Sequence, residues 1–147
     1  MSAPYEAGGP PSGAPGGKTS LGLDSNVGAM LCYILDIVCC TGVILAVIFL
    51  VTEKENRFVK FHAVQSLFLC GTYLLVAIAL AIVGTIFRVA LSTADLGLIA
   101  ILLTFGLRIL VFLVFAVIFV LTGVKAYGGQ WNKLPVIGNF AWDIVNK

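Results

Sequence analysis

Three long apolar runs constrain the fold of this chain more than any other feature of its sequence. They cover about residues 27–51, 63–87 and 96–124, and none of them contains a proline. Each exceeds the roughly 20 residues that a helix needs to cross the hydrocarbon core of a bilayer. Because backbone polar groups in lipid must bond to one another, each run predicts a transmembrane helix.

The composition agrees with this prediction. The chain is 60% hydrophobic and only 11% charged, whereas a soluble domain is about 45–50% apolar and about 25% charged. We therefore expect an all-α integral membrane protein with one membrane domain over residues 25–147. The first 20 residues hold four of the five prolines and five glycines, so residues 1–24 are predicted to form a disordered tail. This tail lacks the basic start and apolar stretch of a signal peptide.

The distribution of Lys and Arg gives a predicted orientation. Three spans would place the loop at 52–62 and the C-terminal tail on one side, with the N-terminus on the other. The first side would carry Lys54, Arg57, Lys60, Lys125, Lys133 and Lys147, and the second Lys18 and Arg88. Positive residues concentrate in the cytoplasm. We expect a multi-pass protein of the inner or plasma membrane, with its N-terminus outside and its C-terminus cytoplasmic.

Two charged residues of opposite sign lie within the apolar runs. Asp36 lies nine residues into the first run and Arg108 twelve residues into the third. A charge at bilayer depth costs at least about 2.5–3.5 kcal/mol. Two parallel spans would place these side chains at depths that differ by roughly 4–5 Å. We therefore predict that they form an ion pair that fixes helix packing. The alternative is a protonated Asp36, with Arg108 reaching the interface or a partner protein.

The segment EKENRFVKFHAVQS at 53–66 joins the first two runs. Its charged part predicts a cytoplasmic elbow, and its polar part continues as a stripe along one face of the second span. The candidate residues of the elbow and stripe are Phe58, Phe61, His62, Gln65, Ser66 and Tyr73. A polar face in a membrane helix normally turns toward protein or water. Alternatively, His62 and Gln65 lie at the membrane interface.

The C-terminal tail is too short and too polar for a fourth span. Apolar residues recur in it with helical period after a proline, and two tryptophans flank the region. This pattern predicts an interfacial helix within residues 131–146 on the cytoplasmic face. Its candidate residues are Trp131, Lys133, Pro135, Ile137, Phe140 and Trp142. We expect Phe58 and Phe61 to pack on its Ile137 and Phe140 face, with Lys60 and Lys133 toward lipid phosphates.

Three segments carry a family resemblance. They read GLDSNVGAMLCYIL, FLVTEKENRFVKFHAVQSL and KAYGGQWNKLPVIGNFA. Together they resemble a family of small prokaryotic membrane proteins that is regarded as distantly similar to the chloroplast inner-envelope import component Tic-twenty. The signature is an acidic-basic loop followed by F-x-x-F-H-A-x-Q-S, and later K-L-P-x-I-G. The resemblance implies a helical membrane protein and, through Tic-twenty, a component of protein translocation.

Nothing in the sequence predicts a reaction. No HExxH, GxSxG or paired-carboxylate motif is present, so we expect no catalytic residues, no cofactor and no metal site. The four cysteines, Cys32, Cys39, Cys40 and Cys70, lie in apolar runs and suit buried packing. We expect a non-enzymatic protein that binds other membrane subunits or itself, within the lipid bilayer and without nucleic acid. The alternative is a homo-oligomeric small transporter or channel.

Overall fold

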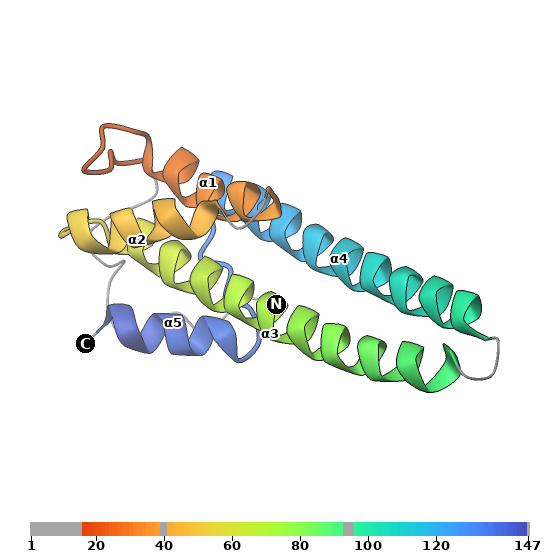
Figure 1. The fold of residues 1–147 in the computed structure, drawn as a ribbon. Helices are drawn as coiled ribbons and strands as arrows, with labels where there is room; N and C mark the ends of the chain where they lie inside the picture. Colours follow the sequence, from red (N-terminus) through yellow and green to blue (C-terminus); the bar gives the residue numbers. More distant parts are fainter. Residues whose placement is uncertain (1–15, 39–40, 93–95, 147) are drawn as a thin grey trace.

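Five helices make up the fold in the computed structural model, which describes residues 16–38, 41–92 and 96–146. They are α1 (Ser25–Ile37), α2 (Gly42–Thr52), α3 (Arg57–Ser92), α4 (Gly97–Tyr127) and α5 (Ile137–Val145). The helices α3 and α4 form a long antiparallel pair (Figure 1). The three short helices gather on the half of this pair that is distant from the α3–α4 connection.

Two of the expected membrane helices are present. The runs at 63–87 and 96–124 lie within α3 and α4. By length and composition, these are the two described helices that can cross a membrane, over residues 57–91 and 97–127. Most of their apolar side chains lie on the outer surface of the protein. Lipid therefore suits this surface better than water does.

The first apolar run is not the single helix that the sequence predicted. It forms α1 and α2, of 13 and 11 residues, and each is shorter than the roughly 20 residues that a span needs. The Thr41 hydroxyl ends α1 by donating to the carbonyl oxygens of Leu35 (2.8 Å) and Val38 (3.0 Å). The chain then turns back, and α2 packs against α1 as a helical hairpin.

Close approach at one glycine shapes this turn. A Cβ at Gly42 would collide with the backbone carbonyl oxygen of Cys32 and with the Asp36 carboxylate. The first residue of α2 can therefore lie against the last turns of α1 because it has no side chain. The hairpin would have to open for any larger residue at this position.

Hydrogen bonds hold the two open ends of the hairpin together. The Ser20 backbone N–H donates to Glu53 Oε2 (2.8 Å), and its hydroxyl donates to Thr52 Oγ1 (2.9 Å). The Asn56 side-chain amide donates to the Ser25 hydroxyl. The same Asn56 caps α3, because its Oδ1 accepts from the Val59 N–H (3.2 Å). We call these five residues, Ser20, Ser25, Thr52, Glu53 and Asn56, the end clasp.

The end clasp differs from the predicted arrangement of the two ends of the first apolar run. The sequence placed residues 18–26 and the 52–62 loop on opposite sides of the membrane, whereas the structure joins them directly. Residues 16–24 also form a turn, in which the backbones of Lys18 and Asp24 form an isolated antiparallel β-bridge and the Ser25 N–H donates to the Gly17 carbonyl oxygen (2.8 Å). The rest of the expected disordered tail, residues 1–15, lies outside the described residues.

We predict that Gly42→Ala destabilises the protein, because the new methyl group overlaps the Cys32 carbonyl. The expected cost is about 1–3 kcal/mol, typical of overpacking in a core. Thermal unfolding of the purified protein in detergent measures it. The matched control is Gly71→Ala in α3, where a Cβ meets nothing within 4 Å. Equal melting temperatures for the two variants would contradict the tight turn.

Candidate functional site

A buried polar network joins α1, α3 and the segment before α5. The Tyr33 hydroxyl lies 3.0 Å from His62 Nδ1. The Gln65 amide Nε2 donates to Tyr33 Oη (3.1 Å) and to the Asn132 carbonyl oxygen (2.9 Å). Since the tyrosine oxygen accepts from Gln65, its own proton is free for His62 Nδ1. We call Tyr33, His62, Gln65 and Asn132 the polar junction.

The burial of the polar junction decides between the two interpretations of the stripe. The side chains of Tyr33, His62 and Gln65 are all fully buried. The Leu134 backbone N–H donates to Gln65 Oε1 (3.3 Å), so both ends of this amide are bonded. His62 and Gln65 therefore face protein, and neither lies at an exposed interface.

Aromatic rings surround the polar junction on the side of α5. The ring centroids of Phe58 and Phe61 lie 4.6 and 5.1 Å from that of His62. Trp131 lies 5.2 Å from Phe58 and 5.5 Å from Trp142. These edge-on arrangements are favourable for aromatic pairs. The elbow and the C-terminal segment are thus packed together by the aromatic cluster of Phe58, Phe61, Trp131 and Trp142.

Of the other residues expected at the C-terminal segment, Ile137 packs toward the elbow as predicted, whereas Phe140 does not. Ile137 packs against the same core as Phe58, while Phe140 is 59% exposed and its ring lies 6.5 Å from that of Phe68. Pro135 is exposed ahead of α5. Lys133 Nζ lies 3.8 Å above the Trp142 ring, a cation–π contact. The face of α5 that contacts Phe61 carries Ala141 and Trp142 instead of Phe140.

Two residues of the predicted stripe do not join the polar junction. The Ser66 hydroxyl donates locally to the Ala63 carbonyl oxygen (3.1 Å). Tyr73 lies two turns further along α3, where its ring centroid is 5.3 Å from that of Phe115 and 6.4 Å from that of Phe112. The structure therefore divides the stripe into a polar part and an aromatic part.

Asp36 occupies the tip of the hairpin. Its side chain is 5% exposed, and neither carboxylate oxygen has a hydrogen-bond partner in the described part of the chain. The carboxylate lies against Gly42, the first residue of α2. The Val43 backbone N–H is close to it, but the two do not form a hydrogen bond. The positive end of the α2 dipole is worth up to about 2 kcal/mol, which is less than the cost of a charge at bilayer depth.

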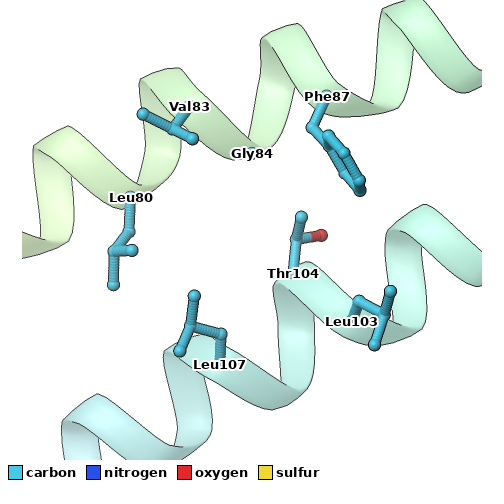
Figure 2. Close-up of a pocket in the computed structure, with 7 residues that line it drawn as sticks. All are labelled: Leu80, Val83, Gly84, Phe87, Leu103, Thr104 and Leu107. Carbon is cyan, nitrogen blue, oxygen red and sulfur yellow. The ribbon is translucent and has the colours of Figure 1, made fainter.

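Arg108 does not meet Asp36. Its guanidinium lies beside Gly84 of α3, with Nη2 3.6 Å from the position of a Cβ at that glycine. Among the described residues, nothing accepts a hydrogen bond from its buried Nε. Gly84 and Thr104 also line a cavity of about 180 Å³ between α3 and α4 (Figure 2). The two charged side chains of the expected ion pair are thus placed apart, Asp36 on α1 and Arg108 between α3 and α4.

Two features of the site were not predicted from the sequence. Tyr33 links His62 to Gln65, and Asn132 anchors the C-terminal segment through its backbone carbonyl. A signal for Tyr33 was available, since it shares the small and polar face of the first run with Asp36. The role of Asn132 depends on a backbone atom and leaves no signal in the side-chain pattern.

The described residues hold no group of three or more His, Cys, Asp or Glu side chains that could bind a metal ion. Cys32 and Cys70 are both buried. Cys39 and Cys40 lie outside the described residues.

The fold and the buried junction define a small helical membrane protein with two long apolar helices. A family model matches residues 24–141, and the chain belongs to the magnetosome magnetite crystal formation protein family. It is 38% identical over 127 residues to a UPF0132 membrane protein of Methanocaldococcus jannaschii, covering 85% of this chain and 92% of that protein.

A UPF0132 membrane protein of Archaeoglobus fulgidus is 34% identical over 119 residues, which are 81% of this chain and 93% of the relative. No solved structure matches the chain. The resemblance to a small prokaryotic membrane protein family is thus confirmed, while these matches give no support to a link with Tic-twenty.

We predict that Tyr33→Phe destabilises the protein by about 1–3 kcal/mol, because it leaves His62 Nδ1 buried without a partner. Thermal unfolding in detergent measures the change. The control is Tyr127→Phe, the same chemical change at a residue that is 57% exposed. If both variants melt together, the junction contributes nothing to stability.

Proposed function

We propose that this chain is a non-enzymatic membrane subunit that acts by binding other membrane proteins or further copies of itself. The observation that carries this proposal is Arg108. It lies in the middle of α4, and its buried Nε has no acceptor within the described residues. A charged side chain at this depth is costly unless it is paired. A partner helix that supplies a carboxylate or carbonyl acceptor would offset that cost.

The outer surfaces of α3 and α4 support the same proposal. The hairpin and α5 pack on one half of this helix pair. The other half of each helix exposes large apolar side chains. Gly71 on α3 and Gly106 on α4 leave open space where a side chain would stand. Small residues allow the backbones of membrane helices to approach closely. At one end of the molecule, α1, α2 and α5 pack against α3 and α4. At the other end, the apolar surfaces of α3 and α4 are available for contacts in the membrane.

The proposed topology has two full spans and a hairpin that enters the membrane and returns. The end clasp, the elbow and α5 all lie at one end of the α3–α4 pair. Among the described residues, this end carries Lys18, Lys54, Arg57, Lys60, Lys125 and Lys133, and the other end carries Arg88. Positive residues favour the cytoplasm. We therefore propose that residues 16–24 and α5 are both cytoplasmic, with α5 at the membrane interface.

The description of the family attaches its members to magnetite crystal formation in magnetosomes. For this chain, that description fits a subunit that organises a membrane assembly better than one that binds the mineral ions itself. The reason is that metal-ligating side chains do not cluster anywhere in the described residues. A second candidate is the homo-oligomeric transporter or channel, which the charged residues at bilayer depth, Asp36 and Arg108, favour.

The topology predicts which cysteines an impermeant thiol reagent reaches in intact cells. In a background without native cysteines, Lys18→Cys and Lys54→Cys should resist labelling from outside, whereas Leu96→Cys, at the opposite end, should react. Labelling of Lys18→Cys together with protection of Lys54→Cys would restore the three-span topology and contradict the hairpin.

The role of Arg108 predicts a change of assembly state. Native mass spectrometry of the wild type in mild detergent should show a complex larger than the monomer, and Arg108→Gln should shift it toward the monomer. The control is Arg88→Gln, because Arg88 already bonds the Gly84 carbonyl oxygen (3.2 Å) and Thr85 Oγ1 (3.2 Å) within the chain.

The masses also separate the two candidate functions. A complex with other proteins in fixed ratio supports an accessory subunit, and a complex of this chain with itself is the state that the transporter or channel requires. A monomeric wild type, or equal behaviour of the two arginine variants, would overturn the proposed role of Arg108.

A further inference from the structure

A second cavity lies between α1, α3 and α4, close to the tip of the hairpin. Its volume is about 350 Å³, within the usual range for small-molecule sites. The lining residues are Asp36, Ile37, Tyr73, Phe112, Phe115, Ala116 and Phe119. Four of the seven are aromatic, and one is a carboxylate.

The buried carboxylate of Asp36 is the feature of this cavity that points to a ligand. Asp36 is 95% removed from solvent, and both of its oxygens lack a hydrogen-bond partner in the described chain. Arg108, which the sequence predicted as its partner, is not among the described lining residues and lies against Gly84 instead. The described lining residues thus include one carboxylate and no positively charged group.

The chemistry of the walls selects the kind of cation. Besides Asp36, the hydroxyl of Tyr73 is the only side-chain oxygen among the described residues that line the cavity. Calcium and magnesium require about six oxygen ligands, and zinc requires several nitrogen, sulfur or carboxylate ligands. Aromatic faces, in contrast, attract alkylated ammonium groups, as in cages for choline and methyl-lysine. The rings of Tyr73 and Phe115 already lie 5.3 Å apart at one wall.

The exposure of two lining residues indicates that the cavity opens toward the outer surface of the helix pair. Phe112 stands at its rim and is 40% exposed, whereas Phe119 at its inner end is 3% exposed. The rim faces the surface that lipid would cover. A ligand that reaches it must therefore be soluble in the bilayer as well as charged.

We propose that this cavity binds a small lipophilic organic cation of the quaternary ammonium class. The Asp36 carboxylate balances its charge, and the rings of Tyr73, Phe112 and Phe115 contact its alkyl groups. This site is independent of the assembly contact at Arg108, so either proposal can fail without the other.

Equilibrium dialysis of radiolabelled benzyltrimethylammonium against the full chain in nanodiscs tests the proposal, with empty nanodiscs as the blank. The wild type should bind the probe saturably. Neopentylbenzene, the neutral compound of the same shape, should fail to displace it. Asp36→Asn should weaken binding by at least about tenfold, while the control Asp143→Asn, at an exposed carboxylate on α5, should leave it unchanged.

A second variant keeps the test decisive if Asp36→Asn fails to fold. Phe112→Leu changes a rim residue and keeps its apolar character, and it should weaken binding of the cation about threefold or more. Circular dichroism and gel filtration confirm folding of each variant. Absence of saturable binding to the wild type would overturn the proposal. Equal displacement by neopentylbenzene, or unchanged binding in the folded variants, would do the same.

Discussion

Hydrogen bonds between residues 17–25 and residues 52–56 hold both ends of the first apolar run at one end of the molecule. The Ser25 hydroxyl is central, since it accepts from the Asn56 amide and donates to the Gly17 carbonyl oxygen (2.6 Å). Each such bond contributes about 0.5–1.5 kcal/mol, and the cap on α3 about 1 kcal/mol. With both ends held there, the 25 residues between them must return on themselves, and the positions of Asp36 and Tyr33 follow.

The hairpin brings two kinds of chemistry to α3. One turn before its tip, α1 carries Tyr33 to His62 and Gln65, where the polar junction connects three segments that are distant in the sequence. At its tip, Asp36 meets the N-terminal end of α2 and faces the aromatic side chains of α3 and α4. One half of the molecule is thus densely bonded, while the far half consists of α3 and α4 with their apolar side chains outward.

The sequence was sufficient to predict the long helices and the common face of His62 and Gln65. The runs that became α3 and α4 are uninterrupted, and period and length leave little choice for them. His62 and Gln65 were correctly predicted to share a face, because three residues along a helix return to nearly the same side. The contact of the elbow with the C-terminal segment was predicted from the apolar residues in both, although Trp131 and Trp142, instead of Phe140, contact Phe58 and Phe61.

The hairpin could not be predicted, because hydropathy does not distinguish one 25-residue helix from two helices of 13 and 11 residues. No proline marks the turn, and Thr41 and Gly42 are ordinary residues in membrane helices. The predicted ion pair failed for the same reason. Its depth estimate assumed that the first run crossed the membrane in full, whereas Asp36 lies level with Phe115 and Phe119 and away from Arg108.

Disulfide crosslinking between position 20 and position 52 in native membranes tests the hairpin most directly. The Ser20 and Thr52 hydroxyl oxygens lie 2.9 Å apart, so a Ser20→Cys, Thr52→Cys pair should form a disulfide readily on mild oxidation, in a background without native cysteines. A Ser20→Cys, Leu96→Cys pair should not. If the first run crosses the bilayer as one helix, residues 20 and 52 are a membrane thickness apart, and the absence of their crosslink would contradict the hairpin.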